Sequence, residues 1–192
     1  HTLSLHDALP ISNGCQFVRF FLHNNMVTVD GQKMGKSLGN FILLKQVFSG
    51  EHEKLQQAYA PEAVRQLVLN SHYRSPIDFS NEALFAAQSG YEKITQAVKS
   101  LRAAAKNAPK GKADDNVIKQ LDDLRGRFEK AMNHALNTSV ALSVIFEMVK
   151  FTNKLLDTAN NSAETLNALD RQFRRLGGDV LGIVRDEYAE SG

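Results

Sequence analysis

Two lysines in a glycine-containing loop are the residues of this sequence best suited to chemistry. Lys33 and Lys36 stand three positions apart in the segment Lys33-Met34-Gly35-Lys36-Ser37. A loop with two ammonium groups can wrap a polyphosphate and neutralise the charge that develops as pyrophosphate leaves. Lysine suits this role because its ammonium group is a compact point charge on a flexible stem. On these residues alone, a hairpin loop without a ligand is the alternative, since short motifs produce many false positives.

Two other places invite a search for metal ligands. Cys15 is the single cysteine of the 192 residues, so neither an internal disulfide nor a cysteine-rich zinc site can form. A lone cysteine is more often a small buried residue than a ligand. In Glu51-His52-Glu53, no second histidine lies at the spacing of a helical metal site, which favours a solvated loop. We therefore predict no metal site in this sequence.

The composition is that of an ordinary globular protein. Hydrophobic residues make up 43% and charged residues 23% of the chain. No run approaches the roughly 18 apolar residues of a membrane-spanning helix, so no membrane association is predicted. The formal net charge of +2 excludes a strongly polycationic nucleic-acid binder but allows a local basic face. We expect a cytoplasmic protein.

The first twelve residues differ in character from the rest. Residues 6–11 back-translate to CAC GAC GCT CTT CCG ATC, which resembles the end of a common sequencing adapter. No basic region precedes an apolar stretch there, so a signal peptide is not predicted. We expect residues 1–12 to be derived from an adapter, with a native loop as the alternative.

A short hairpin is the first element that would position the two lysines. The β-branched run 26–29 is typical of a strand, and Asp30-Gly31 is typical of a tight turn. The polar segment 32–37 then predicts a loop. Apolar residues over 43–48 fall on one helical face, so we expect a helix whose N-terminus offers further backbone donors to a bound anion.

Helical patterns dominate the remaining sequence. Pro61 suits the first position of a helix, and Ser80 is expected to cap a long helix that ends before a linker at 109–112. Three apolar stripes follow with short connections, which predicts an antiparallel bundle, and Gly177-Gly178 is expected to end its last helix. The first stripe is Val117, Leu121, Leu124, Phe128, Ala131 and Ala135. The second is Ala141, Val144, Ile145, Met148 and Leu155, and the third is Leu166, Leu169, Phe173 and Leu176.

Three basic residues share one face of the long helix that precedes the linker. Lys99, Arg102 and Lys106 are three and four positions apart, so together they could follow an RNA backbone. The alternative, which the sequence slightly favours, is an ordinary solvated face, because no aromatic residues are interleaved.

The lysine loop resembles the KMSKS signature of class I aminoacyl-tRNA synthetases, with Gly35 where the signature has serine. More of the chain is similar to the cysteinyl-tRNA synthetase family within that class. The similarity is dense over 17–85 and weaker, but collinear, to about residue 185. The segments that carry it are 21–41, 60–65, His72-Tyr73-Arg74-Ser75 and Asp78-Phe79-Ser80.

The resemblance implies a mainly α chain made of three parts. Residues 13–45 would be the end of a Rossmann-type catalytic domain, 46–112 a connecting helical segment with its linker, and 113–192 a helical anticodon-binding bundle. Lys36 would be the principal phosphate contact and catalytic residue.

The rest of the loop would complete the ATP site around Lys36. Lys33 would assist as a second catalytic residue, and Met34, Gly35 and Ser37 would complete the ATP-binding loop. Glycine at position 35 removes one hydroxyl group and makes the loop more flexible.

The resemblance also implies the activity and the partners. Members of the family activate cysteine with ATP in a Mg-dependent reaction, release pyrophosphate and transfer cysteine to tRNA(Cys). ATP, cysteine and tRNA(Cys) are thus the expected partners, and we expect the full-length enzyme to be a monomer. Family members hold a zinc ion with ligands from a part that this sequence lacks, so this fragment alone is expected to be inactive.

Two alternative functions stay open. One is the related ligase that joins cysteine to a glucosaminyl-inositol amine, which shares the ATP loop but needs no anticodon-binding bundle. The other is a stand-alone helical RNA-binding module, which would bind tRNA with a strong salt dependence but never turn over ATP.

Overall fold

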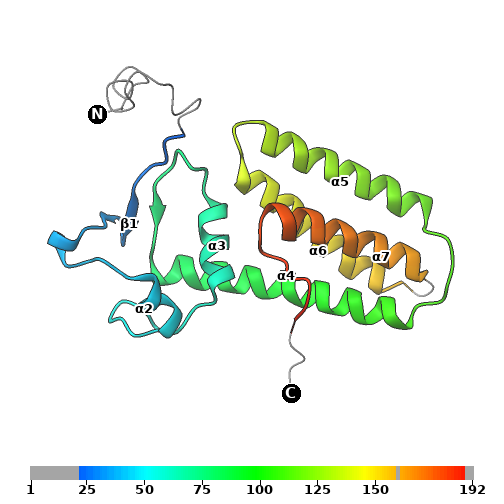
Figure 1. Ribbon diagram of the computed structural model, residues 1–192, viewed down its shortest axis with the longest axis horizontal. Helices are drawn as coiled ribbons and strands as arrows, with labels where there is room; N and C mark the ends of the chain where they lie inside the picture. The colour runs from blue at the N-terminus through cyan, green and yellow to red at the C-terminus, as the bar shows by residue number, and fades with distance from the viewer. Residues whose placement is uncertain (1–21, 159–160, 189–192) are drawn as a thin grey trace, which may run out of the picture.

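The computed structural model describes residues 22–158 and 161–188. A small sheet lies at one end of this part of the chain and a helical bundle at the other (Figure 1). The strands are β1 (Val27–Val29), β2 (Gln32–Lys33) and β3 (Ile77–Asp78). The helical elements are the 3-10 turn η1 (Lys36–Leu38), α2 (Leu44–Ser49), α3 (Pro61–Asn70), α4 (Asn81–Asn107), α5 (Asp115–Asn133), α6 (Thr138–Leu156), α7 (Ala163–Gln172) and the π-helical η2 (Phe173–Val180).

The expected adapter segment 1–12 and Cys15 lie outside the described residues. Within the described ranges, no helix has the length and apolarity needed to cross a membrane.

The sheet has β1 at its centre, with β2 antiparallel on one side and β3 parallel on the other. The predicted hairpin turn is confirmed, since Asp30 and Gly31 have φ angles of 51° and 76°, a conformation that suits glycine and is tolerated by aspartate. The prediction of a loop over 32–37 is wrong at its start, because Gln32 and Lys33 pair with β1. Lys33 therefore stands on a strand and only the residues after it form the loop.

A first core packs under the sheet and is closed by α2, α3 and the start of α4. The expected apolar face over 43–48 is wrong in part, since Val47 is fully buried whereas Leu43, Leu44 and Phe48 are 53%, 56% and 41% exposed. The buried members of this core are Val29, Ile42, Val47, Leu55, Tyr59, Val64, Leu67, Phe79, Leu84 and Ala87.

α4 joins this first core to the bundle as one continuous helix. It starts as predicted, because the hydroxyl of Ser80 accepts a hydrogen bond from the amide of Ala83 at 3.3 Å. Leu84 and Ala87 near its start belong to the first core, whereas its later buried residues, from Ile94 onward, belong to the core of the bundle. α4 therefore contributes buried residues both to the core beneath the sheet and to the core of the bundle.

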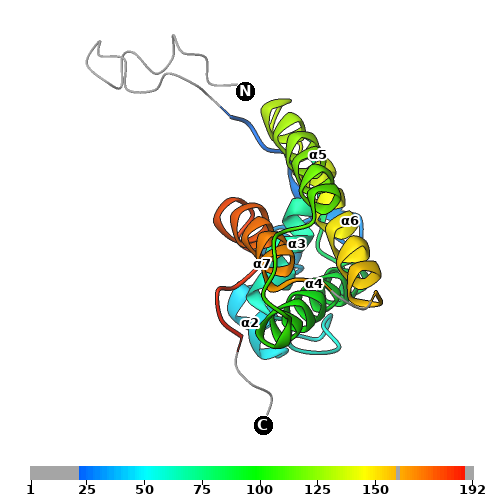
Figure 2. The ribbon, with the colours of Figure 1, turned by 90° about the vertical axis from the view of Figure 1, so that its right-hand side faces the viewer.

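α4, α5, α6 and α7 run back and forth beside one another, so the predicted antiparallel bundle is confirmed (Figures 1 and 2). The apolar stripes form its core, with one exception. Ala135 lies beyond the end of α5, is exposed and has a φ angle of 56°. Asn137 caps α6, since its side chain accepts a hydrogen bond from the amide of Val140 at 3.2 Å.

Gly177 and Gly178 do not end the last helix, contrary to the prediction. The chain continues through them as η2 as far as Val180. A Cβ atom at Gly177 would lie 2.6 Å from a methyl carbon of Val184, so the glycine lets the returning chain pack against the helix. This glycine serves close packing rather than termination.

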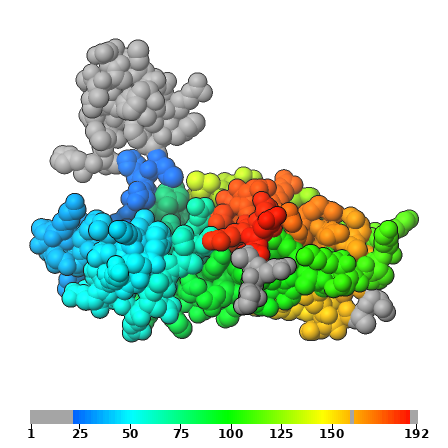
Figure 3. Space-filling view, turned by 60° about the horizontal axis from the view of Figure 1, so that its bottom comes forward, coloured from blue at the N-terminus to red at the C-terminus, as the bar shows by residue number. Residues whose placement is uncertain are grey.

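The last described residues return along the surface from the bundle toward α3 (Figure 3). The guanidinium of Arg185 donates to the carboxylate of Glu62 on α3 at 2.7 Å, and this contact raises the pKa of Arg185. The two ends of the molecule are therefore connected by this segment as well as by α4.

Candidate functional site

The lysine loop leaves the sheet at the end of β2 and projects from the molecule (Figure 1). Lys33 is the last residue of β2, and Lys36 is the first residue of the turn η1. Two backbone hydrogen bonds close this turn, from the amide of Leu38 to the carbonyl of Gly35 at 3.1 Å and from Gly39 to Lys36 at 3.2 Å. Gly39 then ends the turn in the left-handed conformation, with φ at 68°.

Both ammonium groups of the loop lack an acidic partner among the described residues. Lys33 and Lys36 are exposed, and neither forms an ion pair with any residue of the described ranges. The ammonium of Lys36 lies 5.6 Å from the centre of the Phe41 ring, itself exposed, where a cation–π attraction steadies it. Two such cations on one exposed loop form a site for a polyanion.

Met34 and Ser37 complete the predicted loop in different ways. The amide of Met34 donates to the carbonyl of Val27 at 3.0 Å, and its side chain packs against the first core. Ser37 is exposed beside Lys36 in η1. The structure thus places all five predicted residues together, with Met34 anchoring the loop and Lys36 and Ser37 at its surface.

Gly35 is not required by the backbone at its position. Its φ of −163° and ψ of 142° are extended values that any residue adopts. An added Cβ atom would find its nearest neighbour, a carbon of Leu38, at 3.8 Å, which is ordinary contact. The serine of the KMSKS signature would therefore fit here without strain.

Asn40 braces the loop from beneath. Only 7% of its surface is exposed. Its side-chain Oδ1 accepts from the amide of Gly35 at 2.9 Å, and its Nδ2 donates to the carbonyl of Lys33 at 3.0 Å. One side chain thereby fixes the backbone between the two lysines.

Asp78 on β3 braces the hairpin that carries the loop. Its Oδ1 accepts from the hydroxyl of Thr28 at 2.7 Å and from the amide of Gly31 at 2.9 Å. These two hydrogen bonds lower the pKa of Asp78, the one from Thr28 most. The carboxylate ties the central strand and the turn of the hairpin to the neighbouring strand.

Asn40 and Asp78 belong to the segments that carry the family resemblance, but sequence reasoning gave neither a role. For Asn40 a signal was present, because a short polar side chain directly before the apolar Phe41-Ile42 has to find partners if it is buried. For Asp78 no local signal exists, since its partners lie 47 and 50 residues away in the sequence.

The expected contribution of a helix N-terminus to the loop stays a prediction. α2 begins only at Leu44, and η1 with Gly39 and the next residues separates it from the lysines. The amide of Leu43 at that N-terminus is already used, because it donates to the side chain of Gln46 at 2.9 Å.

The His72-Tyr73-Arg74-Ser75 segment lies against the chain that enters the hairpin. The amide of Asn25 donates to the carbonyl of Tyr73 at 2.9 Å, and its side chain donates to the carbonyl of Arg74 at 2.7 Å. His72 accepts from the amide of Arg74 at 3.2 Å and stacks on Tyr73 with 4.6 Å between ring centres. His72 thus shapes this turn, and two segments of the family resemblance meet here.

No zinc site is formed by the described residues. Within 22–158 and 161–188, no three side chains of His, Cys, Asp or Glu gather as metal ligands. His52 instead accepts from the amide of Lys54 at 3.2 Å in a turn. The residues present do not fit the zinc that the family resemblance implies for the full-length enzyme, and no chemical step is assigned to it.

The basic stripe on α4 is not a free row of cations. The guanidinium of Arg102 pairs with Asp170 at 2.7 Å and donates to the carbonyls of Arg185 and Asp186, so its side chain is only 16% exposed. Lys99 lies 5.7 Å from the ring centre of Tyr188. For Arg102, both the RNA-contacting and the solvated interpretation are wrong, because it secures the returning chain.

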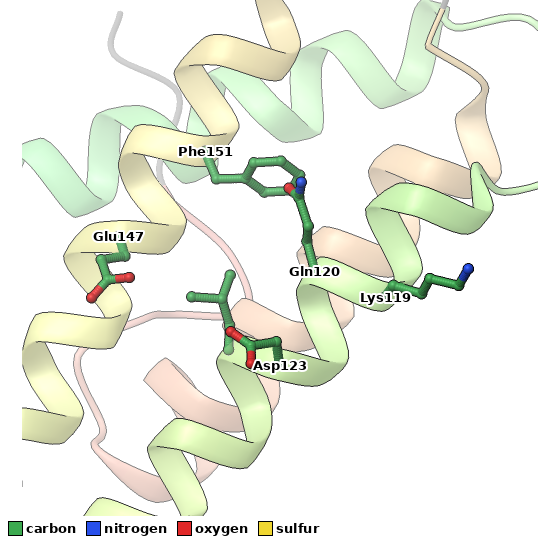
Figure 4. Close-up of a pocket in the computed structure, with 6 residues that line it drawn as sticks. Lys119, Gln120, Asp123, Glu147 and Phe151 are labelled. Carbon is green, nitrogen blue, oxygen red and sulfur yellow. The ribbon is translucent and has the colours of Figure 1, made fainter.

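A shallow cavity of about 390 Å³ opens between α5 and α6 (Figure 4). It contains none of the loop residues, and its lining carries more acidic than basic groups. The residues that line it are Lys119, Gln120, Asp123, Leu124, Glu147 and Phe151. The lysine loop, rather than this cavity, is therefore the candidate site for a phosphate ligand.

Comparison with known families assigns both ends of the molecule. Residues 8–89 match the tRNA synthetases class I (C) catalytic domain, and residues 127–185 match the DALR domain. The first match contains the hairpin, the lysine loop and β3, and the second contains the end of α5 together with α6 and α7.

The chain is also similar to curated proteins called cysteine--tRNA ligase. It is 42% identical over 182 residues to that of Bacteroides fragilis, covering 94% of this chain and 36% of the relative. It is 41% identical over 185 residues to that of Chlorobaculum tepidum, covering 94% and 35%. The chain thus spans about a third of the length of the relatives it matches.

A solved structure shares the fold. The crystal structure of a LeuRS–tRNA–LeuAMS ternary complex from Agrobacterium radiobacter superposes with a TM-score of 0.60 at 21% identity, covering 83% of this chain and 21% of that one.

Proposed function

The chain belongs to the class I aminoacyl-tRNA synthetase family, as a segment that matches its cysteine-specific members, and from this premise we propose that it serves in a cysteine--tRNA ligase. In that reaction a carboxylate oxygen of cysteine attacks the α-phosphorus of ATP, and the bond from that phosphorus to the bridging oxygen breaks. Pyrophosphate leaves with the negative charge and cysteinyl-adenylate remains. A hydroxyl group of tRNA(Cys) then attacks the carbonyl carbon of cysteine, and the bond from that carbon to AMP breaks. ATP would enter with Mg²⁺, as is general for such reactions.

The role of the lysine loop in this reaction is to hold the departing pyrophosphate. Lys36 is the principal contact and Lys33 the second, as the family resemblance implies. Both ammonium groups are exposed and unpaired in the described chain, which supports their role. Their charge stabilises the pyrophosphate most when the bond breaks, so it lowers the barrier more than it strengthens ground-state binding. Met34, Gly35 and Ser37 give the loop its shape. The observation that carries this proposal is the pair of unneutralised ammonium groups on a loop braced by Asn40.

The bundle would contact tRNA. The DALR match over 127–185 and the antiparallel α5, α6 and α7 support this assignment. They also favour a tRNA ligase over the related ligase that joins cysteine to a sugar amine, since that reaction needs no anticodon-binding bundle. Domain boundaries at 45 and 112, a monomeric state and a cytoplasmic location belong to the same proposal.

A chimeric enzyme tests the amino acid and the acceptor. Residues 22–188 would replace the matching region of the Bacteroides fragilis relative, which supplies the remaining two thirds of the length. We expect ATP–pyrophosphate exchange that depends on cysteine, followed by transfer of labelled cysteine to tRNA.

Three other results of that experiment would contradict the proposal. ATP–pyrophosphate exchange that depends on another amino acid would refute the proposal that cysteine is the substrate. Transfer to a glucosaminyl-inositol amine but not to tRNA would favour the sugar ligase. A folded chimera that binds tRNA without any exchange would favour an RNA-binding module.

A further inference from the structure

Among the described residues, only Asn40 makes side-chain hydrogen bonds to the loop backbone between Lys33 and Lys36. Its amide spans from the carbonyl of Lys33 to the amide of Gly35, at 3.0 and 2.9 Å. With 7% of its surface exposed, water competes little for these bonds. We propose that Asn40 is a positioning residue that presets the two lysines for a polyphosphate, a role that rests on the proposed function.

The need for such a residue follows from the loop's own sequence. Gly35 and Gly39 stand on either side of Lys36, and glycine loses more conformational freedom on ordering than any other residue. The turn η1 has only two backbone bonds of its own. A loop without the Asn40 bridge would have to be ordered by its ligand. The conformational entropy lost in that ordering would weaken the affinity for the ligand.

Asparagine is matched to both of its partners. Gly35 offers an N–H group and Lys33 offers a carbonyl, so the side chain must accept at one atom and donate at the other. Aspartate could accept from Gly35 but would place a second acceptor against the Lys33 carbonyl. It would also add a negative charge beside a site that must attract phosphate. Aspartate at position 40 is therefore expected to act worse than alanine on phosphate binding.

Gly35 supplies a way to separate positioning from general support of the fold. Its extended backbone and the 3.8 Å space around its Cβ position accept a serine. Serine restricts the unbound loop without touching Asn40. If Asn40 acts by restricting the loop, Gly35→Ser should recover part of what Asn40→Ala loses.

The test uses the 192-residue chain and tripolyphosphate as the probe. NMR would record the exchange rate of the Gly35 amide, and a titration followed at the Lys36 amide would give the affinity for tripolyphosphate. The variants are Asn40→Ala, Asn40→Asp, Asn40→Ala combined with Gly35→Ser, and Lys36→Ala. Asn107→Ala is the matched control, because Asn107 is exposed at the end of α4 and bonds only to its own helix.

We expect Asn40→Ala to speed exchange of the Gly35 amide about tenfold and to weaken tripolyphosphate binding roughly five- to tenfold, as loss of one to two neutral hydrogen bonds implies. Amides of the bundle should be unchanged, and the added Gly35→Ser should restore part of the affinity. Asn107→Ala should behave as the unaltered chain.

Two results would overturn the inference in distinguishable ways. Unchanged tripolyphosphate affinity in Asn40→Ala, despite faster exchange at Gly35, would reduce Asn40 to a structural residue while leaving the proposed function intact. Equal, negligible binding by the unaltered chain and by Lys36→Ala would refute the phosphate role of the loop itself and this inference with it.

Discussion

Removal of the Asp78 carboxylate should release the hairpin that carries the lysine loop. Its two leading hydrogen bonds, from the Thr28 hydroxyl and from the Gly31 amide, end on the same oxygen, Oδ1. Asp78→Ala loses both bonds, whereas Asp78→Asn retains an oxygen in that place and loses only the charge. The two substitutions therefore separate the bonds from the charge that strengthens them.

The magnitude follows from the strength of charge-assisted bonds. Each contributes about 1.5–3 kcal/mol when well shielded, and partial exposure of Asp78 places its two bonds at the lower end. We expect Asp78→Ala to cost about 2–3 kcal/mol of local stability and Asp78→Asn about 1 kcal/mol. The loss should fall on the hairpin and not on the bundle, since the two have separate cores joined through α4.

Hydrogen exchange under mild urea is the suitable assay, because it reports on each part separately. The amides of Gly31 and Met34 would report on the hairpin, and the amide of Leu124 would serve as the reference in the bundle. Amide exchange at the hairpin should be slowest in the unaltered protein, faster in Asp78→Asn and fastest in Asp78→Ala. Equal hairpin protection in all three proteins, or equal loss at Leu124, would refute the reasoning.

Acid should have the same effect on the unaltered hairpin as Asp78→Asn. The pKa of Asp78 lies below its ordinary value of 3.8, because the Thr28 hydroxyl and the Gly31 amide donate to the ionised form. Because this pKa is lowered in the folded state, the ionised Asp78 contributes its full stabilisation of the hairpin above about pH 3.8. That stabilisation is lost as the pH falls through the lower pKa of the folded state. Urea unfolding of the hairpin at pH 6 and near pH 2.5 should thus differ more in the unaltered protein than in Asp78→Asn, and equal differences would contradict this assignment.

Three substitutions in the bundle, measured by urea unfolding, test how its parts are held. Phe128→Ala should cost about 3–5 kcal/mol, because the ring is 2% exposed in the core and leaves a cavity. Arg102→Met should cost about 1–2 kcal/mol, because Asp170, 12% exposed, loses one of its two guanidinium partners and keeps Arg174 at 2.8 Å. Arg127→Ala should change little, because its pair with Glu147 is 48% and 41% exposed and screened by salt. A loss in Arg127→Ala as large as that in Phe128→Ala would contradict these assignments.

The sequence predicted the elements that local patterns define. Local patterns predict the turn at Asp30-Gly31, the cap at Ser80 and the apolar stripes of α5 and α6. Each of these features depends on residues that are close together in the sequence. The lysine loop was found in the same way, although Lys33 proved to belong to β2.

Contacts between distant segments could not be predicted. β3 is two residues long and follows a proline, and its pairing with β1 joins Val27 to Ile77. The continuation of the last helix through Gly177 depends on Val184 folding back against it. The sequence pattern predicts a surface position for Arg102, because its partner Asp170 lies 68 residues away and is not visible locally. Each of these features arises from tertiary packing that a single-sequence pattern does not contain.

The most direct test of the account is the effect of Lys36→Ala on ATP–pyrophosphate exchange in the chimeric enzyme. The rate of cysteine-dependent exchange should fall by at least about a hundredfold, because the lost charge acts at the transition state, while the KM for cysteine should change little. Lys154→Ala, on the exposed face of α6, is the matched control and should leave the rate unchanged. Equal exchange by the Lys36→Ala and unaltered chimeras would contradict the claim that this loop holds the phosphates of ATP.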